Sequence, residues 1–396
     1  MAEATMTFPA ELAIPDAVLD ISRRLEAAGY ETWCVGGALR DTLLGLPNHD
    51  FDLTTRALPR EVQRLFPRTV PVGIEHGTVA VLDDENTPHE VTTFRRDIKT
   101  DGRHAEVEFG ASLQDDLARR DFTINAIAYH PLRHEWRDPF KGAADLEARV
   151  IRSVGDPNWR FQEDYLRILR AVRFSARFGF RIHPRTLDAA RANVAGLSHL
   201  SAERVRDEWF KGIATAQRVS KLLVLWQDIG AARIWLPEIG KDKDGGALDH
   251  LPRDPVLISA FLAGDPASLL TRLKCANRDI ERGRAIGVWR ERYPDPKHLA
   301  DVRRWLAAVG DHADDLLTLL PAVAPRGVLT ELPAVVRAIR GAKDPLTLKD
   351  LAVTGDDLLA RGVRPGPDVG ATLERLLGEV LEDPAKNTRD YLLARV

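Results

Sequence analysis

The stretch CVGGALRDTLLGLPNHDFDLTT, residues 34–55, decides the fold expected for this chain. It holds the end of a β-rich segment, two glycines, a helical pattern and a second β-rich segment, FDLTT. Residues i and i+2 of an extended strand project to the same side, so Asp50 and Asp52 point together while Phe51 can face the core. Like charges at this spacing repel, which is costly unless a cation offsets the repulsion. The stretch therefore predicts a short strand with a paired-carboxylate site.

The residues around this stretch predict an α/β domain that extends to about residue 150. The segments ETWCV, GTVAVLD and HEVTTF are β-branched or alternate between polar and apolar residues. The polar, turn-rich segment DIKTDGRHAE, residues 97–106, is expected to be a mobile loop. We therefore expect a small mixed sheet with helices.

Helical periodicity dominates after about residue 150. In EDYLRILRAVRFSARFG, residues 163–179, an apolar stripe at helical spacing precedes Gly179, a typical helix terminator. The stripe consists of Tyr165, Leu169, Val172 and Ala176. Further helical segments continue to the end, separated by Pro/Gly clusters such as KDKDGG and RPGPDVG. The expected architecture is an α/β head followed by a long helical body.

Composition narrows the class of protein. With 44% hydrophobic and 29% charged residues, the 396-residue chain resembles soluble globular proteins of two to four domains. It has no apolar run of about 18 residues, so no membrane span is expected, and its N-terminal residues lack a secretory-signal pattern. Cys34 and Cys275 lie in unrelated contexts, which indicates a reducing, cytoplasmic compartment and argues against a disulfide framework.

The glycines before the helix indicate a phosphate site. Gly36 and Gly37 lie where backbone N–H groups at a helix start can approach a phosphate. Arg40, one turn further, can add charge-assisted hydrogen bonds. The same pattern also fits a tight turn packed for steric reasons. It matches neither the Rossmann nor the Walker glycine pattern, so those two interpretations do not apply.

The carboxylates are candidate metal ligands. Mg²⁺ prefers oxygen ligands and keeps positions open for phosphates, and two such ions can activate an attacking hydroxyl and stabilise a leaving pyrophosphate. Asp50 and Asp52 are the expected ligands, and Glu90 in HEVTTF is a candidate third carboxylate. A solvent-facing turn is the alternative for the aspartates. A phosphohydrolase dipeptide is the alternative for His49-Asp50, but no partner ligands on helices accompany it.

Positive charge is concentrated in residues 149–185, where nine arginines face three acidic residues although the net charge of the chain is −3. Such a segment can bind phosphates or form a solvated helix face. A ridge at i+3 steps lies on the polar side of the predicted helix. It consists of Asp164, Arg167, Arg170 and Arg173.

The first two residues of this ridge can select a base. A carboxylate accepts hydrogen bonds and a guanidinium only donates them. Cytosine and adenine present an amino group beside an acceptor nitrogen, whereas uracil and guanine present a carbonyl beside an N–H. Asp164 and Arg167 can therefore select C and A without a template. The alternative is an ordinary helix ion pair.

Taken together, five ordered motifs resemble those of class II tRNA nucleotidyltransferases, the family of CCA-adding enzymes and bacterial poly(A) polymerases. The motifs are VGGALRD…HDFDLTT, TVPVGIEHGTVAV, DDLARRDFTINAIAY and the two in DPFKGAADLEARVIRSVGDPNWRFQEDYLRILRAVRFSARFGF, within about residues 30–183. The tail, DLAVTGDDLLARGVRPGPDVGATLERLLGEVLEDP, is also similar to the family, so the resemblance is essentially full length.

The resemblance implies an α/β nucleotidyltransferase head (1–150), a helical neck with base recognition (151–215), a helical body (216–335) and a helical tail that binds tRNA (336–396). Catalysis and Mg²⁺ binding are implied for Asp50 and Asp52. Nucleotide contacts are implied for residues of the glycine turn, the RRDFT motif and the neck: Gly36, Gly37, Arg40, Arg119, Asp164, Arg167, Arg170 and Arg173.

The activity implied is template-independent addition of C, C and A to the tRNA 3′ end from CTP and ATP, with release of pyrophosphate. The helical body would bind the acceptor and TΨC arms of tRNA, mostly through phosphates. A-adding, CC-adding and poly(A)-polymerase activities remain alternatives, as does a non-catalytic RNA-binding protein with a degenerate head. The segment VGIEHGTVAV is more typical of the tRNA enzymes than of poly(A) polymerases. The presence of loop 97–104 favours CCA or A addition.

Overall fold

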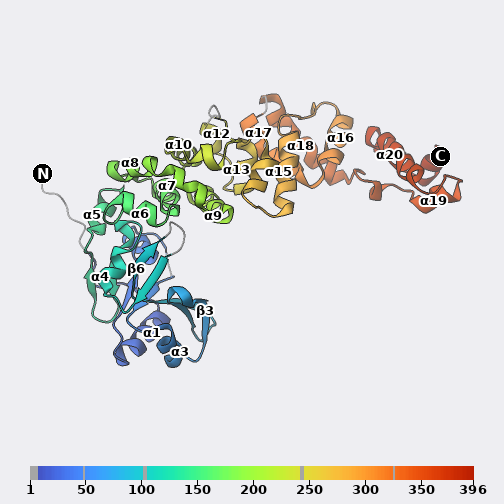
Figure 1. Cartoon of the computed structure of the whole chain (residues 1–396). Helices are drawn as coiled ribbons and strands as arrows, with labels where there is room; N and C mark the ends of the chain where they lie inside the picture. Colours follow the sequence, from blue (N-terminus) through green and yellow to red (C-terminus); the bar gives the residue numbers. More distant parts are fainter. Residues whose placement is uncertain (1–7, 48–49, 101–104, 241–244, 324–325) are drawn as a thin grey trace. The chain divides into compact units, whose positions relative to one another are not determined.

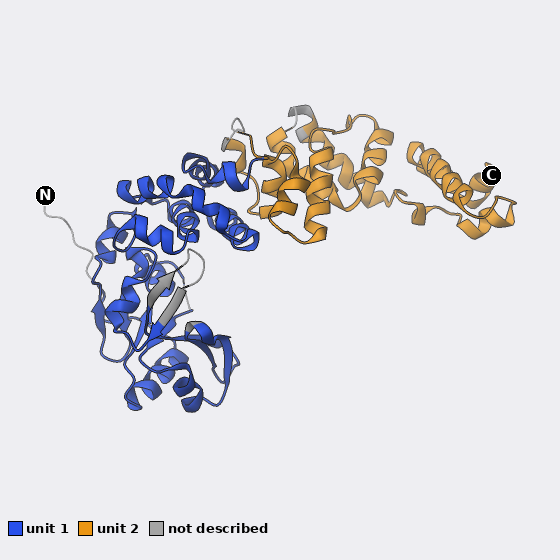
Figure 2. Cartoon of the chain, viewed as in Figure 1, with its two compact units in different colours: residues 1–237 blue, residues 238–396 orange. Residues whose placement is uncertain are grey.

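The computed structural model describes residues 8–47, 50–100, 105–240, 245–323 and 326–396. The chain divides into two compact units, residues 1–237 and 238–396 (Figure 2). The finer division into head, neck, body and tail stays a prediction.

Unit 1 contains a seven-stranded mixed sheet in the order β3-β4-β5-β2-β1-β8-β9. The sheet lies in the N-terminal part of the chain, where β3 is labelled (Figure 1). Strands β2 and β5 run parallel, and the other neighbouring pairs are antiparallel. This sheet confirms the small mixed sheet predicted for the head. Its strands are β1 (Thr32–Val35), β2 (Asp52–Thr55), β3 (Thr69–Gly73), β4 (Thr78–Leu82), β5 (Pro88–Thr93), β8 (Ala128–His130) and β9 (Glu135–Arg137).

The two faces of the sheet carry different cores. On one face, Leu53 and neighbouring valines pack against α1 (Asp16–Ala27) and α3 (Pro59–Leu65). On the other face, Trp33 packs beneath α4 (Leu113–Ala118). Because strand residues alternate between faces, the first face holds the buried Phe51 and Leu53 while the second carries Asp52. The remaining elements of the head are α2 (Gly37–Leu43), η1 (Ile74–His76), η2 (Thr123–Asn125) and α5 (Gly142–Glu147).

A hairpin replaces most of the loop predicted over residues 97–106. Strand β6 (Arg95–Thr100) pairs antiparallel with β7 (Ala105–Phe109). The loop prediction is therefore wrong for the flanking residues, and residues 101–104 lie outside the described part of the chain. The polar character of the segment concealed the β-forming residues Ile98 and Thr100.

The rest of unit 1 is helical apart from two short parallel strands. In α7 the stripe of Leu169, Val172 and Ala176 is buried, and the helix ends at Gly179 with φ +71°. Tyr165 precedes the helix, and its ring lies against Gly196. The elements are β10 (Val150–Ile151), α6 (Pro157–Glu163), α7 (Leu166–Phe178), β11 (Arg181–Ile182), α8 (Pro184–Ala192), η3 (Val194–His199), α9 (Ala202–Thr215), α10 (Val219–Asp228) and α11 (Ala231–Trp235).

Unit 2 is helical throughout its described residues, with one core around Trp305 and a second around Leu358. Among the described residues, none of the helices has the length and apolar character needed to cross a membrane. The elements are α12 (Gly245–Leu248), α13 (Pro255–Leu262), α14 (Pro266–Arg272), α15 (Asn277–Trp289), α16 (Leu299–Val309), η4 (Gly310–His312), α17 (Ala313–Val323), α18 (Arg326–Ala342), η5 (Leu348–Asp350), α19 (Gly355–Ala360), α20 (Pro367–Glu382), η6 (Pro384–Lys386) and α21 (Arg389–Leu393).

Candidate active site

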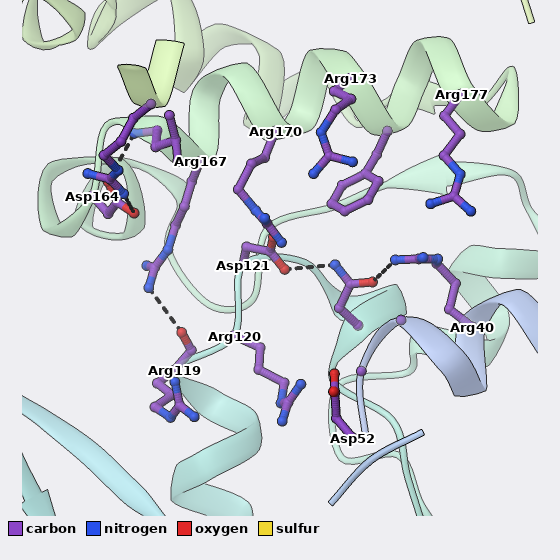
Figure 3. A pocket seen from close by; sticks show the side chains of 16 residues that line it. Arg40, Asp52, Arg119, Arg120, Asp121, Asp164, Arg167, Arg170, Arg173 and Arg177 are labelled. Atoms are coloured by element: carbon purple, nitrogen blue, oxygen red, sulfur yellow. Dashed lines mark hydrogen bonds and ion pairs between the residues drawn. The ribbon is translucent and has the colours of Figure 1, made fainter. Parts of the chain in front are cut away.

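One pocket of about 530 Å³ brings most of the predicted site residues together, between the sheet domain and α7 within unit 1 (Figure 3). Its volume lies in the range of small-molecule sites. Eight arginines and three aspartates line it, so the pocket suits an anionic ligand. The lining residues are Gly36, Gly37, Arg40, Asp52, Arg119, Arg120, Asp121, Asn125, Asp164, Leu166, Arg167, Arg170, Arg173, Phe174, Arg177 and Arg204.

Asp52 joins this pocket to a second carboxylate group. It is the first residue of β2, whereas Asp50 precedes the strand and Glu90 lies on the neighbouring β5. Burial, then the charges of Glu90 and Asp50, raise the pKa of Asp52 to about 6, although Arg120 opposes the shift. The structure thus places Asp50 and Glu90 within electrostatic reach of Asp52, with both of them outside the described pocket lining.

The carboxylates fit a metal ion that is shared with a bound phosphate. Among the described residues, no cluster of three or more His, Cys, Asp or Glu side chains is placed to hold a metal. Two aspartates alone do not make a closed structural site, but hard divalent ions are commonly held by one or two carboxylates plus substrate phosphates. Asp50 and Asp52 supply that donor set. His49, the partner in the phosphohydrolase alternative, lies outside the described residues.

The glycine turn brings backbone close to Asp52. Gly36 has φ +83°, in the left-handed region that favours glycine. A Cβ at this position would lie 3.1 Å from an Arg120 guanidinium nitrogen and 3.6 Å from Asp52 Oδ2. A side chain at Gly36 would therefore crowd the floor of the pocket.

We expect Gly36→Ala to lower activity more than stability alone explains. The left-handed backbone costs an alanine about 1–2 kcal/mol, and the added Cβ also displaces Arg120 beside Asp52. Gly45→Ala is the matched control, since Gly45 has φ +70° and a Cβ added there would meet nothing within 4 Å. Denaturant midpoints should fall in both variants, whereas the KM for nucleotide should rise only in Gly36→Ala. Equal KM values in the two variants would contradict this prediction.

A chain of hydrogen bonds ties the head to α7 (Figure 3). Buried Arg40 donates to Asn125 Oδ1 (2.6 Å), and Asn125 donates to Asp121 Oδ1 (2.8 Å). Arg170 donates to Asp121 Oδ2 (2.7 Å) from the helix above. Although burial raises it, Arg170 and the hydrogen bond from Asn125 hold the pKa of Asp121 well below its usual range. The network fixes Arg40 and Arg170 in one wall of the pocket.

Asp116 positions the two arginines of the RRDFT motif. This carboxylate is fully buried and accepts from Arg119 Nε (2.9 Å), from an Arg120 guanidinium nitrogen (3.3 Å) and from Thr54 Oγ1 (3.3 Å). Despite burial, the two guanidinium groups lower its pKa. Because Thr54 lies on the same strand as Asp52, its hydrogen bond to Asp116 ties α4 to the strand that carries Asp52.

Asp164 and Arg167, the two residues predicted to select the base, both line the pocket, and each is held by another partner. Helix α7 begins at Leu166, so Asp164 precedes the helix and does not belong to its ridge. Asp164 accepts two hydrogen bonds from Arg204 (2.9 and 3.0 Å). Arg167 donates to Glu163 (2.7 Å) and to the backbone carbonyl of Arg119 (3.0 Å). The alternative of an ordinary Asp164–Arg167 helix ion pair is therefore replaced by two separate pairs, Asp164–Arg204 and Arg167–Glu163.

The C-terminal half of α7 adds two further arginines, Arg173 and Arg177, to the pocket lining. Arg173 donates to Glu208 (2.6 Å) and lies over the Phe174 ring, and Arg177 donates to Asp41 (2.8 Å). Sequence reasoning missed several lining residues. Arg120, Asp121 and Asn125 lie in the quoted RRDFTINA motif and Arg177 continues the helical spacing, so the sequence carried a signal for them. Arg204 has no such local signal. The lining residues that were not predicted are Arg120, Asp121, Asn125, Arg177 and Arg204.

A mixed sheet that carries paired carboxylates at a strand start, beside a glycine turn and an arginine-lined pocket, defines a nucleotidyltransferase. The family models that match this chain agree with this class of protein. The model described as "Poly A polymerase head domain" matches residues 32–152, "Probable RNA and SrmB- binding site of polymerase A" matches 179–242, and "tRNA nucleotidyltransferase domain 2 putative" matches 339–396.

Full-length relatives narrow the class further. The CCA-adding enzyme of Lacticaseibacillus paracasei is 36% identical and covers 97% of this chain and 96% of its own length. That of Levilactobacillus brevis is 38% identical, with coverages of 95% and 96%. The crystal structure of the Bacillus stearothermophilus CCA-adding enzyme in complex with CTP is 32% identical, with a TM-score of 0.81 and 96% of both chains covered. The chain belongs to the CCA-adding enzyme family, whose members use a divalent metal ion.

Proposed function

We propose that this protein adds C, C and A to the 3′ end of tRNA from CTP and ATP without a nucleic-acid template. The observation that carries the proposal is the single pocket that joins Asp52 to the arginine wall and to the Asp164–Arg167 region. Family membership and the CTP complex of a 32% identical relative support it. A cytoplasmic location is also proposed, since the buried Cys34 forms no disulfide.

The pocket residues account for binding of the nucleoside triphosphate. Gly36, Gly37 and Arg40 offer backbone and guanidinium donors for the phosphates, and Arg119 stands beside them. Asp50 and Asp52 would hold Mg²⁺, which when bound lowers the pKa of the attacking hydroxyl and neutralises charge on the leaving pyrophosphate. Glu90 is the third catalytic carboxylate of this proposal, which is supported by the effect of its charge on Asp52.

The proposed reaction transfers a nucleotidyl group to the RNA and releases pyrophosphate. The 3′-oxygen of the RNA forms a bond to the α-phosphorus, the bond from that phosphorus to the oxygen bridging to the β-phosphate breaks, and pyrophosphate leaves. The hydroxyl proton passes to water. The fixed guanidinium groups of the pocket stabilise the phosphates without reorganising, because each is already hydrogen-bonded to the protein.

Base choice is assigned to Asp164 and Arg167. Asp164 is an acceptor for the amino group of cytosine or adenine, and Arg167 a donor for the adjacent ring nitrogen. Arg204 orients the carboxylate and Glu163 orients the guanidinium. The acceptor and TΨC arms of tRNA are proposed to bind the helical parts, supported by the matches of residues 179–242 and 339–396 to RNA- and tRNA-related models.

The function is tested with tRNAs that end before the first C, after one C and after two. Each is incubated with CTP alone, with ATP alone and with both. We expect CTP alone to complete CC, ATP alone to extend only the tRNA that ends in CC, and both together to complete CCA on every substrate.

The alternatives give other patterns in the same assay. An A-adding enzyme extends only the tRNA ending in CC, and a CC-adding enzyme stops after the second C. Long A tracts indicate a poly(A) polymerase. Binding of tRNA with no extension would contradict the proposed catalysis and identify an RNA-binding protein.

A further inference from the structure

The turn between α6 and α7 carries Asp164, and Arg167 follows in the first turn of α7. Both residues, to which base choice is assigned, line the nucleotide pocket, and so does Leu166. Tyr165 lies among them in the sequence, but it is absent from the described lining of the pocket. The Tyr165 side chain therefore points away from the nucleotide and does not read the base itself.

The ring of Tyr165 lies directly on the backbone of Gly196 in η3. A Cβ added to Gly196 would overlap this ring. The backbone of Gly196 is outside the left-handed region, so its conformation would admit other residues as well. The missing side chain at this position therefore serves the contact, because the Tyr165 ring fills the space that a Cβ would take.

The segment that supports the ring is fixed from two sides. Trp235 on α11 donates from its indole N–H to the carbonyl of Leu197, the residue after Gly196 (2.9 Å). Asn193, which directly precedes η3, donates from its side chain to Asn158 on α6 (2.9 Å). The Tyr165 ring therefore rests on backbone that is tied both to α6 and to α11.

The same stretch of chain also holds the Asp164 carboxylate. Arg204, near the start of α9, donates to both carboxylate oxygens (3.0 and 2.9 Å). Oδ1 of Asp164 accepts a further hydrogen bond from the backbone N–H of Leu166 (3.1 Å). Residues 196–204 thus contact the turn twice, at the Tyr165 ring and at the neighbouring carboxylate. A shift of the ring would move the carboxylate with it, since the two residues are adjacent.

We propose that Tyr165 is a positioning residue for base choice, whose ring on Gly196 fixes the Asp164 carboxylate relative to the Arg167 guanidinium. The inference rests on the proposed function and adds the contact that holds its base-reading pair in place. Rejection of a wrong base requires donors to stay opposite donors and acceptors opposite acceptors. A turn that could move would let the two side chains adjust to uracil or guanine, so a fixed turn contributes directly to selectivity.

The first test removes the ring and measures base choice. The full chain is assayed with CTP and with UTP on a tRNA that ends before the first C. In Tyr165→Ala the ratio of kcat/KM for CTP to that for UTP should fall about tenfold, because misplacing a functional group by about 1 Å can cost about 100-fold in rate. Tyr165→Phe keeps the ring and should keep the ratio of the unsubstituted chain.

Tyr293→Ala is the matched control for this test. Tyr293 is also a half-buried tyrosine, but it packs against the core around Trp305 in unit 2. Both alanine variants should unfold at lower denaturant concentration than the unsubstituted chain. Only Tyr165→Ala should change the ratio for CTP and UTP, and a purely structural role would leave that ratio unchanged in both.

The second test examines the contact between the ring and the glycine. Gly196→Ala places a methyl group where the Tyr165 ring lies, so it should lower the CTP-to-UTP ratio by itself. In Tyr165→Ala the same space is open, and adding Gly196→Ala should lower the ratio no further. Such non-additivity is expected of two residues in contact. If Gly196→Ala alone does not fold, the double variant should fold as well as Tyr165→Ala does.

The remaining outcomes count against the proposal. An unchanged ratio in folded Tyr165→Ala would overturn it, as would additive effects of Tyr165→Ala and Gly196→Ala. If Tyr165→Ala does not fold, Tyr165→Leu, which keeps apolar volume without the flat ring, is measured in its place. If Arg167→Ala changes the ratio and Tyr165→Ala does not, the proposed base-reading pair stands and only this inference fails. If the unsubstituted chain adds no nucleotide, the proposed function itself fails, and this inference with it.

Discussion

Asp52→Asn should abolish nucleotide addition while leaving tRNA binding intact. Asp52 is the carboxylate that lines the pocket and also interacts with Asp50 and Glu90, so it stands where metal and phosphate must meet. Removing its charge halves the negative charge of the two aspartates proposed to hold the metal. Loss of residues that merely orient metal ligands costs about 10- to 100-fold in activity, so loss of a ligand should exceed about 100-fold. The measurement is single-turnover addition of A to a tRNA ending in CC, at saturating ATP.

Asp20→Asn is the control for this experiment, because Asp20 is an exposed carboxylate on α1 whose ion pair with Arg24 spans 4.0 Å. It removes the same charge from the same domain and should retain full activity. Thermal unfolding of Asp52→Asn should occur at or above the temperature of the unsubstituted chain, since a raised pKa shows that the ionised carboxylate is disfavoured there. Substantial activity in Asp52→Asn would refute the metal assignment.

The architecture could be predicted from the sequence because the composition and spacing of most segments agree with the strand or helix that each one forms. FDLTT, GTVAVLD and HEVTTF have strand composition and became β2, β4 and β5, and the stripe of α7 is buried as its spacing indicated. The prediction of a loop over residues 97–106 is wrong for the residues that flank positions 101–104, because these polar segments have enough β propensity to pair as strands. The order of strands in the sheet was beyond prediction, since it depends on contacts between residues far apart in the chain.

The candidate site was predictable in its members but not in its pairings. Asp52, Arg40, Arg119, Asp164 and the arginines of α7 all line one pocket, as their motifs implied. The partners that hold them come from distant segments, and side-chain spacing along one helix cannot reveal them. Arg204, which binds Asp164, lies 40 residues away on α9, and Asp121, which binds Arg170, lies 49 residues away. Periodicity within a helix also placed Asp164 on α7, whereas the backbone turns before Leu166.

The second large effect is expected in base choice, where Arg167→Ala should let UTP compete with CTP. Arg167 is half-buried in the pocket, and its guanidinium is oriented by Glu163 and by the backbone carbonyl of Arg119. If Arg167 selects the base as proposed, it would face the N–H of a bound uracil as donor against donor, a mismatch that leaves polar groups unpaired at a cost of roughly 1–3 kcal/mol. Removing the guanidinium removes that penalty for UTP and the matching hydrogen bond for CTP. The ratio of kcat/KM for CTP to that for UTP should fall about 5- to 150-fold.

Competition between labelled CTP and UTP on a tRNA that ends before the first C measures this ratio directly. Arg191→Ala is the matched control, because Arg191 lies on α8, outside the pocket lining, and binds Asp228 in a partly exposed ion pair. Its ratio should equal that of the unsubstituted chain. Because Arg167 also bonds the Arg119 carbonyl, its loss should loosen the nucleotide as a whole, so overall kcat/KM for CTP should fall as well. An active Arg167→Ala enzyme that still rejects UTP would show that another pocket residue selects the base, and Asp164 held by Arg204 would then be the residue to substitute.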